Sequence, residues 1–370
     1  MKKFFLMIAV LMISFSAAHA HEMNDEIAKR IDQVFGTVYN NADEPGAAVL
    51  IMQGKDIIYS KCFGLADMET KEPVTLETNF CIASVSKQFS AVALLQLAEE
   101  GKLSLNDPLS KFFPEFQAPF FKEITLHHIL SHTSGIPDAR PRDDRNFVLY
   151  STDVNSVQYM RTLDHLNFQP GSKYEYINPT FQLIYQIVER VSGVPFETYM
   201  QNNIFGRIGM RTCQYFEPNR KIANMAHGYE RNSDGTWREY DYGEESFFAT
   251  KADGALYCSI SDFVRWEHAL RDNRVWIASS KRQAYTPWIR IPADAEYGYQ
   301  PYTGYGYGFF IQDYPGQPTH VYHLGDNGGF TIYAGKIPER DLIFLFFSTR
   351  PDIERLNIVN QVYHILGFDF

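Results

Sequence analysis

Ser84 and Lys87 are the residues whose types and spacing most directly indicate chemistry. They lie three residues apart in the stretch Cys81-Ile-Ala-Ser-Val-Ser-Lys-Gln-Phe-Ser90. Positions three apart on a helix share one face, so we expect the hydroxyl and the amine to be neighbours. A neutral amine can accept the proton of a serine hydroxyl and turn it into a nucleophile. A serine at the start of a helix is more often a cap, so this pair alone favours a structural role.

The residues after Ser84 predict the helix that would hold this pair. Apolar side chains recur near helical spacing from Val85 to Ala98, and Gly101 follows as a stop signal. Ser84 would then lie at the helix N-terminus. The unpaired backbone N–H groups at such a terminus favour developing negative charge.

Two later stretches complete an ordered set of motifs with Ser84-x-x-Lys87: they are Tyr176-Ile-Asn178 and His323-Leu-Gly325. The set resembles that of the serine β-lactamase and penicillin-binding-protein superfamily, specifically the class C β-lactamase-like branch. That branch also contains DD-peptidases, esterases and D-aminopeptidases. The resemblance covers nearly the whole chain beyond residue 20. Supporting matches are Phe63-Gly-Leu-Ala-Asp67, Leu130-Ser-His-Thr-Ser-Gly135, Gly206-Arg-Ile-Gly-Met210 and Gly254-Ala-Leu256.

The resemblance implies a role for each motif residue. Ser84 would be the nucleophile that forms an acyl-enzyme, and Lys87 and Tyr176 would share the proton transfers. Asn178 would contact the amide of the substrate and Lys87. The backbone N–H groups of Ser84 and Asp326 would form an oxyanion hole. No cofactor is implied.

The third motif departs from the Lys-Thr-Gly of class A β-lactamases and many penicillin-binding proteins, and their Ser-Asp-Asn motif is also absent. His323 stands where that lysine would help to bind a substrate carboxylate. Because histidine is only partly charged near neutral pH, an efficient β-lactamase is disfavoured, and esterase or peptidase members fit better. We expect Gly325 to let a substrate strand lie close to the sheet edge, since a side chain there would block it.

The elements that must position these residues fall into two groups. Strand-like runs around a Gly-containing turn at 46–63 predict a hairpin, and two more strands are predicted at 329–336 and 342–348. From about 103 to 245, helix-length segments alternate with Pro and Gly breaks. We therefore expect an α/β fold of the α+β type, in which an antiparallel sheet from both chain ends is flanked by helices and carries an all-helical insert. The resemblance implies the same β-lactamase/transpeptidase-like fold.

The predicted organisation is one serine hydrolase domain over residues 21–370, preceded by a signal peptide. Its α/β lobe takes in about 21–105 and 248–370, and its helical lobe about 106–247.

The first twenty residues have the pattern of a secretory signal peptide. Lys2 and Lys3 precede an apolar run that is too short to span a bilayer comfortably, and Ala18-His-Ala20 is a small-x-small cleavage site. No cysteine that would signal a lipid anchor follows Ala20 directly, and no later apolar run reaches about 18 residues. We predict a periplasmic or secreted protein, cleaved after Ala20, with no membrane anchor.

The charge of the chain argues against a nucleic-acid partner. The formal net charge is −10, and the loss of Lys2 and Lys3 with the signal peptide makes it −12. Nucleic-acid binders present a basic face instead. The expected partner is a small-molecule or peptide substrate, which peptidoglycan could supply.

The cysteines and histidines leave two further questions. Four cysteines (Cys62, Cys81, Cys213 and Cys258) allow three full disulfide pairings, and buried thiols are an equal alternative. His128 and His132 have the i, i+4 spacing of a zinc pair, but the glutamate of His-Glu-x-x-His is absent and no third ligand is evident. We therefore predict no metal site.

Three functions compete at this stage. The first is an exported serine hydrolase that cleaves amides or esters of the β-lactam or D-amino-acid peptide type. The second is a carboxylesterase with little β-lactam turnover, and the third is a non-catalytic peptidoglycan-binding module. The presence of Ser84, Lys87 and Tyr176 together favours an enzyme, because a binding module has no need of all three.

Overall fold

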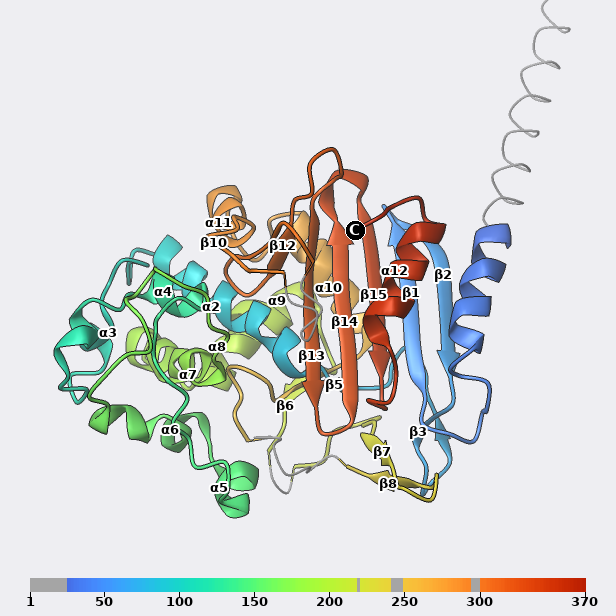
Figure 1. The fold of residues 1–370 in the computed structure, drawn as a ribbon, viewed down its shortest axis with the longest axis horizontal. Helices are drawn as coiled ribbons and strands as arrows, with labels where there is room; N and C mark the ends of the chain where they lie inside the picture. The colour runs from blue at the N-terminus through green and yellow to red at the C-terminus, as the bar shows by residue number, and fades with distance from the viewer. Residues whose placement is uncertain (1–24, 218–219, 241–248, 294–299) are drawn as a thin grey trace, which may run out of the picture.

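The computed structural model describes residues 25–217, 220–240, 249–293 and 300–370. The predicted signal peptide, residues 1–20, lies outside the described residues. Figure 1 shows a large sheet on one side of the molecule and a group of helices on the other, with α2 between them. No helix in the described ranges has the length and apolar character needed to cross a membrane.

The large sheet joins the two ends of the chain, as predicted. Among the described residues, eight strands run in the order β10-β11-β12-β13-β14-β15-β1-β2, and every neighbouring pair is antiparallel. Their bounds are β1 Ala47–Gln53, β2 Asp56–Phe63, β10 Ile289–Arg290, β11 Thr303–Tyr305, β12 Phe310–Gln312, β13 His320–Asn327, β14 Phe330–Ile337 and β15 Leu342–Ser348. β1 pairs with β15, so an early hairpin extends a sheet built mainly from late strands.

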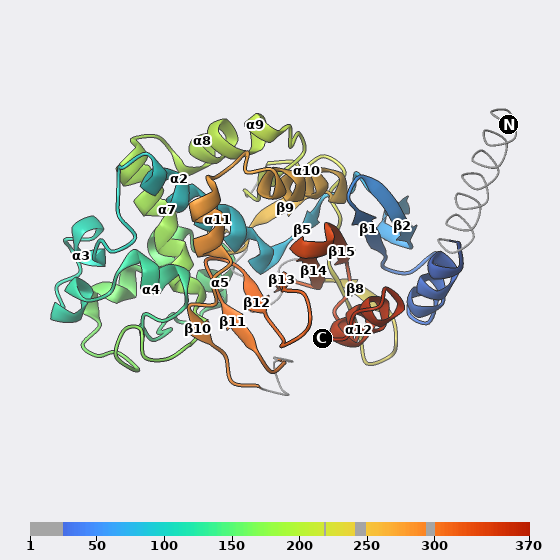
Figure 2. The ribbon, with the colours of Figure 1, turned by 90° about the horizontal axis from the view of Figure 1, so that it is seen from above.

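The two faces of this sheet are covered by different helices. Along β1, Val49 and Ile51 point to the face packed by residues 25–36, which are helical, and by α12 (Arg355–Ile365). Alternate residues of the same strand point to the opposite face and join the core around α2 and α10 (Ile260–Arg271). Figure 2 shows α10 and α12 on opposite sides of the sheet. The expected arrangement of helices around an antiparallel sheet is confirmed.

The middle of the chain supplies the second body of the fold. Its helices are α3 Leu109–Phe112, α4 Leu126–Leu130, α5 Arg145–Tyr150, α6 Asp153–Ser156, α7 Asn178–Ser192, α8 Phe196–Met200 and α9 Gly206–Ile208. The segment also ends in short strands that the sequence pattern did not indicate: β6 Gln214–Tyr215, β7 Tyr229–Arg231 and β8 Trp237–Glu239. Strands of two or three residues are too short to show the alternation on which strand prediction depends.

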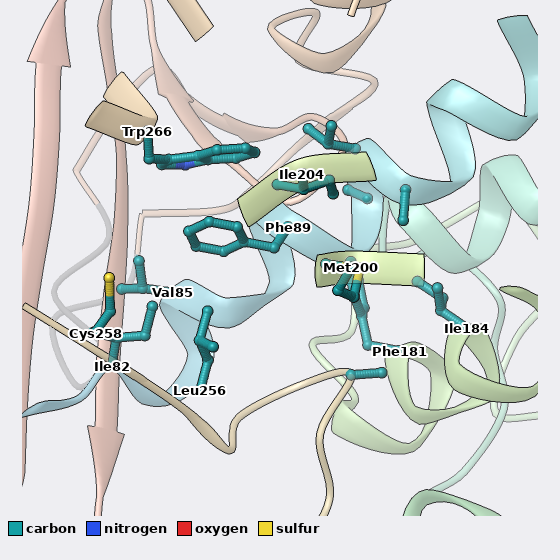
Figure 3. Packing of buried hydrophobic residues seen from close by; sticks show 14 of the residues in the cluster. Ile82, Val85, Phe89, Phe181, Ile184, Met200, Ile204, Leu256, Cys258 and Trp266 are labelled. Atoms are coloured by element: carbon teal, nitrogen blue, oxygen red, sulfur yellow. The ribbon is translucent and has the colours of Figure 1, made fainter. Parts of the chain in front are cut away.

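The helix after Ser84 is buried on all sides. A 3₁₀ turn, η1 (Ala83–Ser86), leads into α2 (Lys87–Glu99), and every residue from Lys87 to Leu97 is buried. In Figure 3, Phe89 of α2 stacks on Trp266 of α10, and the ring centroids lie 4.1 Å apart. A helix surrounded by core is a rigid support for residues at its end.

One disulfide crosses a small sheet beneath this helix. Cys213 and Cys258 are joined, while Cys62 and Cys81 lie outside the bridge. The bridge links the residue before β6 to the last residue of β9 (Leu256–Cys258), and β9 pairs on its other side with β5 (Phe80–Cys81). The strand β5 leads directly into the turn that holds Ser84.

A buried ion pair between β14 of the large sheet and α10 gives a stability prediction. Lys336 of β14 donates to both carboxylate oxygens of Glu267 at 2.8 and 3.0 Å, and both side chains are more than nine-tenths buried. Glu267→Gln leaves the lysine charge without its partner, so we expect a loss of about 3–5 kcal/mol in the free energy of unfolding, measured with urea. The exposed pair Glu100–Lys102 provides the control, because Glu100→Gln is expected to cost less than about 1 kcal/mol. Equal losses in the two variants would contradict the prediction.

Candidate active site

The turn that presents Ser84 has a strained backbone at the preceding residue. Ala83 has a φ of 46°, in the left-handed region that residues other than glycine rarely occupy. Ser84 itself is half-buried, whereas Ala83, Val85 and Ser86 are buried. The turn therefore leaves the Ser84 side chain accessible at the start of a buried helix.

Lys87 lies against the Ser84 hydroxyl. Its Nζ is 3.0 Å from Ser84 Oγ and donates to the backbone carbonyl of Asp253 at 2.9 Å. Burial lowers the pKa of Lys87 to about 8; the Asp253 carboxylate opposes this shift and the Arg140 charge adds to it. A neutral amine in this position can keep its donor bond to the Asp253 carbonyl and accept the proton of Ser84.

Tyr176 of the second motif also lies close to the Lys87 amine. The Tyr176 ring centroid is 5.1 Å from Lys87 Nζ, and the Phe181 ring centroid is 5.7 Å away. Asn178 is the first residue of α7, and its Oδ1 is buried without a hydrogen-bond partner in the described part of the chain. A buried amide oxygen without a partner calls for an explanation, and a donor on a bound molecule would supply one.

His132 supports the second motif, a role that the sequence did not reveal. Its buried ring lies 4.2 Å from the Tyr176 ring, and its Nδ1 accepts the N–H of Ile177 at 3.3 Å. The His132 carbonyl accepts the N–H of Glu175 at 3.0 Å. Burial, and then the Lys87 charge, lower the pKa of His132 well below its usual value. The stretch that contains His132 matched the family pattern, and that match was the available signal.

His323 is a buried neutral side chain in this structure. Its Nδ1 lies 2.7 Å from the Leu324 carbonyl, which can only accept, so Nδ1 carries the proton. Its Nε2 then accepts from the Tyr305 hydroxyl at 2.9 Å. Burial is the main cause that lowers the pKa of His323 to about 3. The position therefore supplies no positive charge at neutral pH.

Gly325 allows a close approach within the protein itself. A Cβ at this position would lie 2.4 Å from the Ile82 carbonyl oxygen and 3.3 Å from Ala83 Cβ. We expected the missing side chain to make room for a substrate strand, but here it lets β13 pack against the turn that carries Ser84. The residue fixes the distance between the sheet edge and the nucleophile.

The third motif ends at a strand edge that faces this turn. β12 pairs only with the first part of β13, through Tyr322. The following residues pair with β14 on one side and lie beside η1 on the other. Gly328 and Gly329 both have positive φ, as a type I′ hairpin turn requires. Along an antiparallel strand, the N–H groups of successive residues point alternately towards the partner strand and away from it. Asn327 forms the hydrogen-bonded pair with Phe330 next to the hairpin turn, so the N–H of Asp326 points away from β14, towards the free edge. The Asp326 carboxylate is held by Arg355 through two bonds of 2.9 and 3.0 Å.

His128 and His132, the pair considered for a metal, and the neighbouring His127 have separate partners. His127 Nδ1 lies 2.7 Å from the Tyr307 hydroxyl, and His128 Nδ1 accepts the N–H of Thr125 at 3.1 Å. In the ranges that the structure covers, no group of three or more His, Cys, Asp or Glu side chains is arranged to hold a metal ion.

Comparisons with known proteins show what this chain is similar to. A family model described as beta-lactamase matches residues 29–364. Penicillin-binding protein 4* of Bacillus subtilis (strain 168) is 27% identical over 93% of this chain and 77% of its own length. The putative penicillin-binding protein PbpX of the same strain is 28% identical over 87% of this chain and 75% of its own length.

Solved structures show the same architecture. The octameric penicillin-binding protein homologue from Pyrococcus abyssi has a TM-score of 0.75 at 26% identity, and the match covers 95% of this chain and 78% of that one. A D-amino acid amidase from Ochrobactrum anthropi SV3 has a TM-score of 0.74 at 22% identity, covering 94% and 99%. At that lower identity the amidase supports the fold alone.

Proposed function

We propose, because this chain belongs to the beta-lactamase family of serine hydrolases, that Ser84 attacks an amide or ester carbonyl and carries the acyl group as an acyl-enzyme. The observation that carries this proposal is the 3.0 Å contact between Ser84 Oγ and a buried amine whose pKa is lowered to about 8. An unassisted serine hydroxyl is a weak nucleophile, and a neutral amine in contact with it removes that limitation.

In the acylation step, Ser84 Oγ bonds to the carbonyl carbon while its proton passes to Lys87. The carbonyl oxygen becomes negative and accepts from the backbone N–H groups of Ser84 and Asp326, each of which can contribute roughly 3 kcal/mol in the transition state. Lys87 then returns the proton through the Tyr176 phenol to the leaving nitrogen or oxygen, and the scissile bond breaks. Asn178 Oδ1 accepts a hydrogen bond from the substrate.

Deacylation repeats these transfers with water. The phenol and the amine remove a proton from a water molecule, whose oxygen attacks the acyl carbon. Ser84 Oγ leaves and recovers its proton from Lys87. Every proton taken up is returned, so the cycle consumes only substrate and water.

The neutral His323 bears on the choice of substrate. A substrate whose binding depends on a carboxylate would find no positive charge at that position, since burial keeps this ring uncharged. We therefore favour short amides or esters, including D-amino-acid peptides, over efficient β-lactam hydrolysis. A carboxylesterase with little β-lactam turnover is the second candidate, and the same observation favours it. The class C-like branch, with its Tyr-x-Asn motif, is the proposed place within the family.

Export and a two-lobed organisation complete the proposal. A signal peptide over residues 1–20 would deliver the domain to the periplasm or the exterior, and the Cys213–Cys258 disulfide suits such an oxidising compartment. The lobes, about 21–105 with 248–370 and about 106–247, would meet at Ser84. Peptidoglycan would then be an accessible source of substrate. Intact mass of the secreted protein would locate the cleavage site.

The function is tested by incubating the protein with a penicillin, a chromogenic cephalosporin and a short-chain p-nitrophenyl ester. We expect a covalent adduct or turnover with at least one of them, followed by intact mass and by product absorbance. Ser84→Ala should abolish both signals, while Ser86→Ala, a change at the neighbouring buried serine, should keep them. Turnover by the Ser84→Ala variant would contradict the mechanism. The absence of both adduct and turnover with all three compounds would favour the non-catalytic binding module.

The acylation rate should follow the loss of one proton from Lys87, with a midpoint near pH 8. Because the pKa of Lys87 is about 8, the amine is mostly protonated at pH 6 and mostly neutral at pH 9. We expect the rate to rise through this range and to level off above it, measured by stopped-flow or by adduct formation at fixed times. A midpoint well away from pH 8 would mean that a group other than Lys87 limits the acylation rate.

A further inference from the structure

The carbonyl that holds Lys87 belongs to a loop, residues 250–253, which comes directly before Gly254 and β9. This loop is fixed by the carboxyl group of Asp153, at the start of α6. Asp153 Oδ2 accepts the N–H of Lys251 at 2.7 Å, and its Oδ1 accepts the N–H of Ala252 at 2.9 Å. The Ala252 carbonyl in turn accepts the hydroxyl of Ser90 on α2 at 2.6 Å. A side chain from the helical insert therefore ties the loop to the helix that carries the base.

A second buried carboxyl group lies in the loop itself. Asp253 is 5% exposed; its Oδ2 accepts from Gln182 of α7 at 3.1 Å, and Gln182 accepts from Ser156 of α6. Its Oδ1 is buried without a hydrogen-bond partner among the described residues. Two buried carboxyl groups thus meet this loop, one within it and one bonded to it, and the proposed proton transfers use neither.

We infer that Asp153 and Asp253 are positioning residues for Lys87. Asp153 holds the loop so that the Asp253 carbonyl meets the amine, and the Asp253 carboxylate sets how strongly that amine holds its proton. The inference rests on the proposed function, because it concerns the base of that same site.

The electrostatics around both groups support this inference. The charged or titratable groups that face Lys87 are Asp253 of the loop, Arg140 and His132 from the segment after α4, Tyr176 before α7 and His323 of β13. Of these, the Asp253 carboxylate raises the pKa of Lys87, against the effect of burial. Asp153 faces Asp253, Tyr185 and Tyr215, and burial followed by the Asp253 charge raises the pKa of Asp153 to about 8.

Two substitutions separate the positional effect from the charge effect. Asp253→Asn keeps the backbone carbonyl and can still accept from Gln182, so it removes the charge alone. Asp153→Asn sets an amide NH₂ against one of two backbone N–H donors, so the loop must move. A displacement on the order of 1 Å at a reacting group can cost about 100-fold in rate.

Asp262 offers a matched control. It is also buried, and its Oδ2 accepts two backbone N–H groups, those of Thr212 at 2.7 Å and Cys213 at 3.2 Å. The oxygen of an asparagine could keep both of these bonds, so Asp262→Asn instead sets an amide NH₂ against the Arg265 guanidinium, which now donates to Oδ1 at 2.9 Å. This variant therefore removes a buried carboxylate from the core without touching the loop that holds Lys87.

The experiment measures the Lys87 titration directly by NMR on the full chain labelled with ¹³Cε-lysine, with the signal assigned by its loss in Lys87→Met. We expect a midpoint near pH 8 in the wild-type protein. In Asp253→Asn the midpoint should move to lower pH. The acylation rate should fall by about tenfold or more in Asp153→Asn, while Asp262→Asn keeps the wild-type rate, with urea unfolding of both variants recorded alongside.

An unchanged Lys87 midpoint in Asp253→Asn would overturn the inference, as would equal loss of acylation in Asp153→Asn and Asp262→Asn. The titration needs no substrate. If no compound acylates Ser84 but the midpoint still moves with Asp253, the proposed function fails and the positioning stands. If Asp153→Asn does not fold, the Asp253→Asn titration decides alone.

Discussion

Lys87→Met is expected to lower acylation by about 10³-fold and to leave the protein more stable at neutral pH. A general base contributes roughly 10²–10⁴-fold to such a reaction, and no other amine contacts Ser84 among the described residues. Methionine fills a similar volume without a charge, so the buried helix should remain intact. Adduct formation with the best substrate found for the wild-type protein would be followed by intact mass, and a fall of about 10³-fold is expected.

The stability gain follows from the direction of the pKa shift. The pKa of Lys87 lies at about 8 in the folded protein, below its ordinary value of 10.5, so the unfolded chain binds more protons between those values. Wild-type stability therefore rises with pH across that window, and the cost of the buried charge is fully present below pH 8. The shift corresponds to about 3 kcal/mol at pH 7, and the lost bonds to Ser84 and the Asp253 carbonyl offset part of it. Removal of the amine should therefore raise the free energy of unfolding by about 1–2 kcal/mol at pH 7 and by less towards pH 10.

Urea unfolding of both proteins at several pH values checks this expectation. A Lys87→Met protein that is less stable than the wild type at pH 7 would show that the bonds to Ser84 and to the Asp253 carbonyl outweigh the cost of burying the amine. A variant that still acylates at the wild-type rate would mean that Tyr176 acts as the base without Lys87.

The pairing of Ser84 with Lys87 could be predicted because it depends on local geometry. Three residues of helical or 3₁₀ backbone bring the two side chains together whatever surrounds them. The state of His323 could not be predicted in the same way. Its neutrality depends on burial and on the Tyr305 hydroxyl, which comes from another strand. The sequence indicated a partly charged ring, and the tertiary structure removes the charge.

The same distinction applies to the fold. β15 was predicted with its observed ends, because six consecutive apolar residues and Ser348 form a central strand that is buried on both faces. The loop at 250–253 gave no such signal, since its order comes from the Asp153 carboxyl group and from Ser90. Contacts between segments distant in sequence leave no periodic pattern, and the supports of the base could be recognised only in three dimensions.

Gly325→Ala is expected to lower acylation by about 100-fold while leaving the titration of Lys87 unchanged. The added Cβ would lie 2.4 Å from the Ile82 carbonyl oxygen, closer than any real contact, so β13 must move away from the turn. One proposed oxyanion donor belongs to that turn and the other to β13, so the gap between them widens. Loss of one such donor costs about 10²–10³-fold in the chemical step.

The matched control introduces a similar clash in the same strand pair, β13 and β14, but at a position distant from Ser84. In Gly335→Ala the new Cβ would lie 2.0 Å from the Tyr333 hydroxyl, so this variant should also lose stability. Its acylation rate should remain near that of the wild type, because β13 keeps its place beside Ser84. The measurement is the acylation rate over pH for both variants, with urea unfolding alongside. A Gly325→Ala protein that acylates normally would remove Asp326 from the oxyanion hole, because the displaced strand would then carry no part of the chemistry.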